Sequence, residues 1–104
     1  MPAGSASPPA NPYWSFMDRV DRLKRLRFRA WHRGTKEADM LVGGFFDSHH
    51  ETWTEEEMSW FERFLEEQDV DIMAWAIGTA APPQRWQGDM MRRLQTINYI
   101  KHAE

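Results

Sequence analysis

The chain has 104 residues, of which 41% are hydrophobic and 28% are charged, and its formal net charge at pH 7 is -3. These values are those of one globular domain of ordinary composition. The sequence contains no Cys, which excludes a disulfide framework, a zinc thiolate centre, iron–sulfur ligation and a cysteine nucleophile. No apolar run approaches the roughly 18 residues of a membrane-spanning helix, so we expect no membrane insertion.

The first residues form a segment rich in Pro, Ala and Ser, and no charged side chain occurs before Asp18. A secretory signal needs a basic start and an apolar stretch, and a mitochondrial transit peptide needs arginines; neither pattern is present. We interpret residues 1–14 as a disordered tail and residues 15–104 as one helical domain. The expected location is the cytoplasm of a bacterium, or the mitochondrial matrix if the source is eukaryotic.

No strand alternation or hairpin signal occurs, and apolar residues recur at helical spacing. The first helix is predicted to run from about Ser15 or Asp18 to His32. Gly34 is well placed to end it, because glycine adopts the left-handed conformation at little cost. The apolar stripe expected on this helix consists of Val20, Leu23, Leu26 and Ala30.

A second helix is predicted after Thr35, whose hydroxyl is placed to cap its first turn. Its apolar stripe consists of Ala38, Leu41, Val42 and Phe45. The adjacent Gly43 and Gly44 are expected to weaken this helix or to end its regular part.

The third helix has the clearest start signal in the sequence. Thr54 and Glu57 have the spacing of a capping box, and Trp53 with Met58 can form a hydrophobic staple across it. Three consecutive glutamates then occupy the first turn, where the helix dipole favours acids.

A short fourth helix is predicted from Asp69 or Asp71 to Ile77, where Gly78 stops it, and a fifth over about residues 88–101. The apolar face of the fifth helix consists of Met90, Leu94 and Ile97. We therefore predict an all-α fold, a compact bundle of about five short helices.

Charge is distributed unevenly along these helices. Residues 19–36 hold eight basic side chains and one acid, whereas residues 55–71 hold eight acids and one base. A basic helix can bind nucleic acid, an acidic lipid surface or an acidic protein, but a solvated helix face needs no partner. Composition alone favours the solvated face.

Sequence patterns for catalysis are missing. There is no phosphate-binding glycine loop and no nucleophile elbow. His49, His50 and Glu51 are metal-ligating residue types, but neighbouring helical side chains point about 100° apart and do not easily close on one ion. We therefore predict that the chain is not an enzyme and has neither catalytic residues nor a metal site.

The most informative stretch joins the first two helices. Arg33 precedes the predicted glycine turn, and Glu37 lies in the first turn of the second helix. Such a corner projects charged groups from a fixed backbone, which suits recognition. In the alternative interpretation, Arg33 caps carbonyls at the end of the first helix and Glu37 complements the dipole of the second. Physical reasoning alone favours this alternative.

The same stretch resembles the SdhE family, because residues 33–37 form its R-G-x-x-E motif and Asp39 follows as it does in that family. Residues 71–75 resemble the family's D-x-x-x-W helix, and a Pro-containing loop and a Met-rich last helix follow in order. The resemblance covers about residues 19–101. The R-G-x-x-E motif alone is a weak signal, but the ordered set is specific.

This resemblance implies an assembly factor that binds the flavoprotein subunit of succinate dehydrogenase, and in some bacteria that of fumarate reductase. It would promote a covalent bond between a histidine of that client and the 8α-methyl of FAD. No tightly bound cofactor is expected, since FAD belongs to the client, and we expect a monomer. The partner-binding residues implied by position are Arg33, Gly34 and Glu37, followed by Trp31, His32 and Asp39.

Two alternatives remain open at this point. The basic residues 19–36 could serve a helical nucleic-acid-binding module, or the chain could be an antitoxin-like partner. The acidic third helix and the negative total charge argue against nucleic acid.

Overall fold

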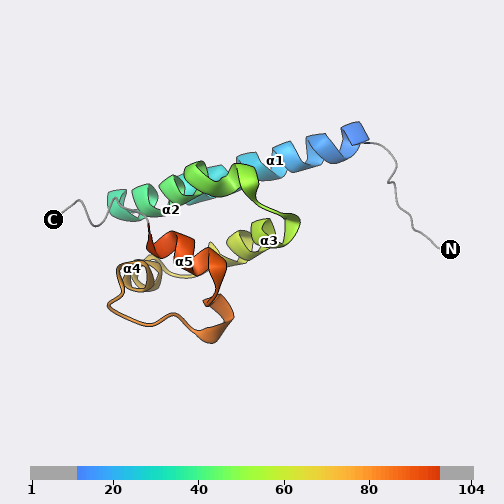
Figure 1. Ribbon diagram of the computed structural model, residues 1–104. Helices are drawn as coiled ribbons and strands as arrows, with labels where there is room; N and C mark the ends of the chain where they lie inside the picture. The colour runs from blue at the N-terminus through green and yellow to red at the C-terminus, as the bar shows by residue number, and fades with distance from the viewer. Residues whose placement is uncertain (1–11, 97–104) are drawn as a thin grey trace.

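The computed structural model describes residues 12–96, with side chains from Phe16 onward, as five α-helices and two 3₁₀ turns (Figure 1). This part of the chain contains no strand, which confirms the predicted all-α bundle of five helices. The elements are α1 (Pro12–Trp31), α2 (Lys36–His49), η1 (His50–Thr52), α3 (Glu55–Phe64), α4 (Asp69–Ile77), η2 (Gln84–Trp86) and α5 (Asp89–Gln95). Helix α1 begins before the expected Ser15, and most of the predicted tail lies outside the described residues.

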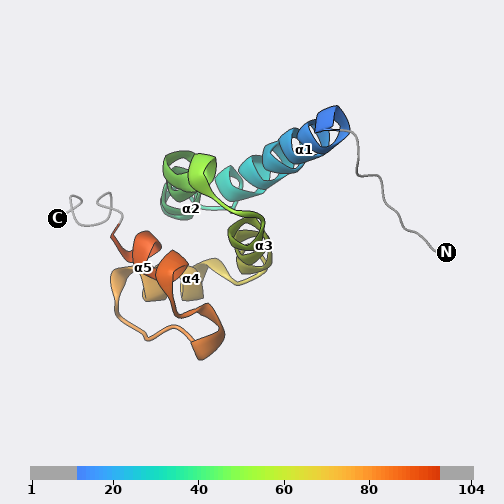
Figure 2. The ribbon, with the colours of Figure 1, turned by 45° about the vertical axis from the view of Figure 1, so that its right-hand side comes forward.

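The helices form two groups around one core. Helices α1 and α2 lie side by side, and α3, α4 and α5 lie against them on the other side of the core (Figures 1 and 2). The largest side chains of the core are the fully buried Phe45, Phe46, Phe61 and Phe64. The first turns of α1 extend beyond the rest of the bundle (Figure 2).

Most predicted stripes are buried, because apolar faces at helical spacing must pack on another element. All four stripe residues of α2 are buried, whereas in α1 only Leu26 and Ala30 are, and Val20 and Leu23 are half-buried. In α5, Met90 and Leu94 are buried, and Ile97 lies outside the described range.

The adjacent glycines do not end α2, which continues unbroken to His49. This corrects the expectation from helix propensity. The reason is tertiary: a Cβ at Gly43 would lie 2.2 Å from Cδ2 of Trp31, so the missing side chain lets the end of α1 pack closely on α2. Gly44 has no such neighbour, since a Cβ there would meet nothing within 4 Å.

The predicted helix ends of α3 and α4 are confirmed. The Thr54 hydroxyl accepts a hydrogen bond from the Glu57 backbone N–H at 3.1 Å, and the Glu57 carboxylate accepts one from the Thr54 N–H at 3.0 Å. Trp53 and Met58 on either side of this capping box are both buried. Helix α4 ends at Gly78, whose φ is 98°. Local hydrogen-bonding chemistry therefore sets these boundaries.

Ion pairs between the basic run and the acidic run join α1 to α3. The residue numbers of the partners rise together along both helices, so α1 and α3 run parallel. Exposed pairs contribute roughly 0–1 kcal/mol each, and their order agrees with the parallel orientation of the two helices. The pairs are Arg19–Glu55 (3.1 Å), Arg22–Glu55 (2.9 Å), Arg22–Glu62 (2.9 Å) and Arg29–Glu66 (2.7 Å). These three arginines therefore have an intramolecular role, and their charges need no external anionic partner.

Glu67 ties the loop before α5 to the end of α3. Its carboxylate accepts hydrogen bonds from the Arg85 guanidinium (2.8 Å) and from Nε1 of Trp86 (2.9 Å). The hydrogen bond from Arg85, followed by the one from Trp86, outweighs desolvation and holds the pKa of Glu67 below its ordinary value.

Because the pKa of Glu67 is lower in the folded than in the unfolded chain, the ionised carboxylate stabilises the fold above the unfolded pKa. That stabilisation disappears as the pH falls through the folded pKa. We expect Glu67→Gln to lower the free energy of unfolding near neutral pH by about 1 kcal/mol, and the two proteins to converge in acid. Urea unfolding followed by Trp fluorescence across the acid range measures this. A constant difference at all pH values would contradict it.

Candidate partner-binding site

The corner between α1 and α2 forms as the sequence predicts. Gly34 has a φ of 125°, a conformation that side chains other than glycine rarely adopt. The Thr35 hydroxyl accepts a hydrogen bond from the Ala38 N–H at 3.1 Å and caps α2. The Asp39 carboxylate reaches back and accepts hydrogen bonds from the N–H groups of Arg33 (2.5 Å) and Gly34 (3.4 Å). A side chain of α2 therefore holds the backbone of the corner by hydrogen bonds.

The Arg33 side chain fixes this corner to the turn between α3 and α4. Its Nε donates to the Asp69 carboxylate, and its two terminal nitrogens donate to the carbonyls of Leu65 and Glu67, all at 2.7 Å. Only 9% of the side chain is exposed. Those carbonyls lie just after α3, where no further N–H groups of the helix are available to donate to them. Arg33 thus caps carbonyls, as the alternative interpretation held, but at the end of α3 and not of α1.

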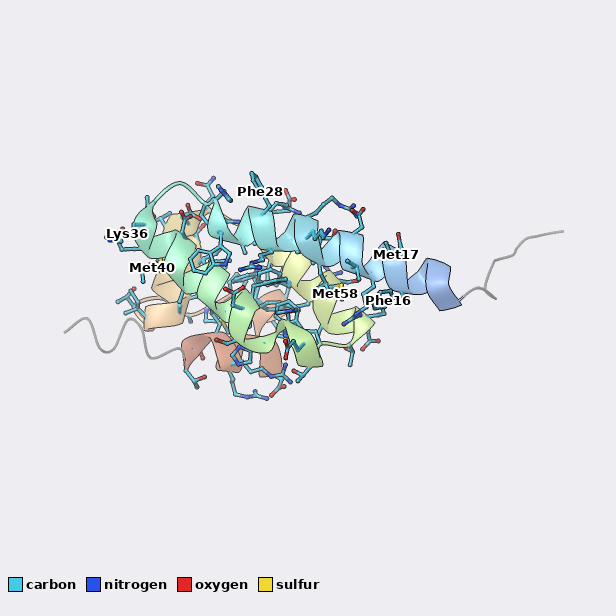
Figure 3. All side chains as sticks on the ribbon, turned by 90° about the horizontal axis from the view of Figure 1, so that it is seen from above. Phe16, Met17, Phe28, Lys36, Met40 and Met58 are labelled. Atoms are coloured by element: carbon cyan, nitrogen blue, oxygen red, sulfur yellow. The ribbon has the colours of Figure 1, made fainter. Side chains whose placement is uncertain are left out.

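Gly34 and Glu37 are the parts of the motif that face outward. Both are exposed, and a Cβ at Gly34 would meet nothing within 4 Å. Figure 3 shows Lys36 and Met40 at the same end of α2. The outer surface here forms an open hollow of ≈ 530 Å³. Its lining consists of Trp31, His32, Gly34, Thr35, Lys36, Asp39 and Met40.

Trp31 and His32 differ in their surroundings. Trp31 is half-buried against Gly43, and its buried Nε1 has no hydrogen-bond partner within residues 12–96. His32 is exposed and stacks on Phe28, with ring centroids 3.9 Å apart and planes at 16°. Its Nδ1 lies 2.7 Å from the Phe28 carbonyl. A carbonyl only accepts, so Nδ1 carries the hydrogen and Nε2 is the nitrogen left for another partner.

The structure thus divides the predicted site residues into two groups. Arg33, Asp39 and Trp31 are partly buried and shape the corner, with Trp31 and Asp39 also lining its hollow, whereas Gly34, Glu37 and His32 are exposed. Sequence reasoning missed Phe28, which is 63% exposed and lies against His32. Its signal was available, since Phe28 is a large aromatic residue off the apolar stripe of α1.

The histidines that were candidate metal ligands make local hydrogen bonds in the structure. His49 and His50 each direct Nδ1 to a backbone carbonyl one turn earlier, that of Phe45 (3.2 Å) and that of Phe46 (2.9 Å). No group of three or more metal-ligating residues gathers anywhere in this part of the chain. None of its helices has the length and apolarity that crossing a bilayer requires.

The described part of the chain is thus a small helical fold whose charged runs pair with each other and whose first two helices meet at a hydrogen-bonded corner. The chain belongs to the family described as flavinator of succinate dehydrogenase, whose model matches residues 24–98. This confirms the family to which the R-G-x-x-E motif pointed. The family is one of assembly factors, in agreement with the prediction that the chain is not an enzyme.

Relatives are found in bacteria and in fungi. The chain is 41% identical over 82 residues to the FAD assembly factor SdhE of Acetobacter pasteurianus, a match that covers 79% of this chain and 75% of the relative. It is 30% identical over 111 residues to the mitochondrial succinate dehydrogenase assembly factor 2 of Cryptococcus neoformans, covering 98% and 61%. The corresponding protein of Candida glabrata is 30% identical over 99 residues, covering 90% and 65%. The chain therefore spans just under two thirds of these fungal relatives.

Proposed function

We propose that this chain binds the flavoprotein subunit of succinate dehydrogenase and promotes the covalent attachment of FAD to that subunit. Family membership and the names of the relatives support this proposal. The flavoprotein of fumarate reductase is a second client of the same kind. The chain acts as a monomer where its client is assembled, in the bacterial cytoplasm or the mitochondrial matrix.

FAD belongs to the client in this proposal. Ligand sites normally enclose most of a bound molecule, whereas the hollow at the corner is open to solvent. The flavin supplies the chemistry of bond formation, and the protein contributes orientation. This chain therefore works as a template that selects one conformation of its client.

The binding free energy that such selection needs is modest. In the reactive conformation of the client, the flavin and the accepting histidine are in contact. A partner that binds this conformation about 1.4 kcal/mol more tightly than the others raises the relative population of the reactive conformation about tenfold. A rigid partner does this best, because a flexible surface would adapt to every conformation alike.

Family membership is the observation that carries the proposal, and the corner supplies its contact surface through a division of roles among its residues. Arg33 and Asp39 hold the backbone, so Gly34 and Glu37 are exposed in a fixed geometry. Gly34 allows the client backbone to approach closely, and Glu37 pairs with an Arg or Lys of the client. Arg33 is the positioning residue in this arrangement.

Co-expression tests the function directly. The chain is produced with the succinate dehydrogenase flavoprotein of its host in cells that lack the native factor, and the client is then denatured. Flavin fluorescence that stays with the client polypeptide reports covalent attachment. We expect it with the chain and a marked loss without it; equal fluorescence in both cases would refute the proposal.

The role of Glu37 has a matched test. Glu37→Ala is expected to reduce covalent flavin about tenfold, the effect of losing one charge-assisted contact at an interface. Glu56→Ala is the control, because Glu56 is also an exposed acid in the first turn of a helix and its loss weakens the helix dipole interaction equally. If both variants behave alike in the flavin fluorescence assay, Glu37 acts only through its helix.

A further inference from the structure

Helix α1 carries an aromatic pair that the fold does not use. In the described part of the chain, three Phe–His pairs with a spacing of four residues lie in contact: Phe28–His32 and Phe46–His50 stack, and the rings of Phe45 and His49 are tilted by 37°. In α2 the phenylalanines are core residues, and Phe45 and Phe46 are 0% and 2% exposed. Phe28 is 63% exposed. Its ring therefore stacks on His32 while most of its apolar surface remains in water.

The surface around this pair is hollowed on several sides. Besides the hollow at the corner there are two smaller hollows, of ≈ 310 Å³ and ≈ 300 Å³, and Phe28 and His32 line each of them. His32 also lines the corner hollow together with Gly34. A partner surface seated on Gly34 therefore continues without a break onto His32 and Phe28.

The rim of this surface is basic. Lys24, one turn before Phe28, and Arg27 are exposed, and Arg29 is half-buried. Arg27 and Arg29 are already paired with Asp47 (3.5 Å) and Glu66 (2.7 Å), so the basic charge available to a partner at this rim is that of Lys24, which has no ion pair within the described residues. A partner with a carboxylate beside an apolar recess complements this arrangement in both charge and shape.

We propose that the Phe28–His32 stack is an aromatic anchor that inserts into an apolar recess of the flavoprotein client, with a client carboxylate opposite Lys24. This inference rests on the proposed function and extends the contact made by Gly34 and Glu37. A preordered aromatic side chain is the type of residue that dominates interface affinity, since little conformational freedom is lost when it is buried. The Nε2 of His32 lies at the edge of the anchor and supplies one polar contact.

Helix α1 offers a matched control for this anchor. Phe16 is 61% exposed, close to the value for Phe28, and it lies near the outer end of the same helix. Figure 3 shows the two rings on different faces of α1, with Phe28 on the side away from α2. Truncating either ring removes a similar exposed apolar surface, so general effects of lost hydrophobicity cancel in the comparison.

The test measures the affinity of the purified full chain for the purified flavoprotein subunit by isothermal titration calorimetry. Phe28→Ala is expected to weaken binding at least about tenfold, and Phe16→Ala to change it by less than about twofold. Lys24→Glu should weaken binding at low salt, with a difference that shrinks as salt is added. Thermal unfolding checks that each variant is folded.

The outcomes separate the two proposals. If the unmodified chain binds no flavoprotein, the proposed function and the anchor both fail. If it binds, and Glu37→Ala weakens binding while Phe28→Ala and Phe16→Ala give equal affinities, the anchor is refuted and the function stands. A tenfold effect confined to Phe28→Ala supports the anchor.

Discussion

Replacing Arg33 with Ala is expected to lower the free energy of unfolding by about 3 kcal/mol, a large fraction of the stability of a small domain. The guanidinium makes three hydrogen bonds to the turn between α3 and α4, and the side chain is only 9% exposed. Its removal leaves the carbonyls of Leu65 and Glu67 without these donors and Asp69 without its cation. Unsatisfied groups of this kind are more damaging than the lost attraction itself.

Urea unfolding followed by far-UV circular dichroism measures this effect. Arg25→Ala is the control, because Arg25 pairs with Asp21 one turn away and both side chains are more than half exposed, so its loss is worth less than about 1 kcal/mol. Arg33→Lys tests geometry, since one ammonium cannot reproduce the planar fork that joins three acceptors. If Arg33→Ala keeps full stability and loses only client binding, then Arg33 contacts the client directly.

Arg33 also illustrates what the sequence could and could not predict. The motif identified it as a site residue, and helix-end chemistry predicted that it caps carbonyls. Its acceptors lie 32 to 36 positions further along the chain, and nothing local specifies such a contact. The charge runs were equally visible in the sequence, but their mutual pairing became apparent only once α1 and α3 were seen to run parallel.

Features that depend on neighbours in the chain were predictable in detail. The positive φ at Gly34 and Gly78 and the capping hydrogen bonds of Thr35 and Thr54 follow from residue types at fixed offsets. The exposure of Phe28 was not predictable in the same way. An aromatic residue off the core stripe can be covered by a neighbouring element, and only the fold shows that none of the described elements buries it.

The two adjacent glycines of α2 should respond in opposite directions to the same substitution. Gly44→Ala is expected to raise the free energy of unfolding by about 0.5–1 kcal/mol, because alanine favours the helix and a Cβ there meets nothing within 4 Å. Gly43→Ala is expected to lower it by about 1–3 kcal/mol. Its Cβ would lie 2.2, 2.4 and 2.7 Å from three atoms at the centre of the Trp31 indole, which cannot yield without moving the whole ring.

A double-mutant cycle assigns the Gly43 effect to Trp31. In a Trp31→Ala background the obstructing ring is absent, so Gly43→Ala should lose its penalty and behave like Gly44→Ala. Urea unfolding of the four proteins gives the coupling free energy. If Gly43→Ala stabilises the unmodified chain as Gly44→Ala does, the close approach of the two helices is not what requires glycine. If the coupling is large, displacement of Trp31 should also disturb the corner that follows it, and covalent flavin in the client should fall with stability.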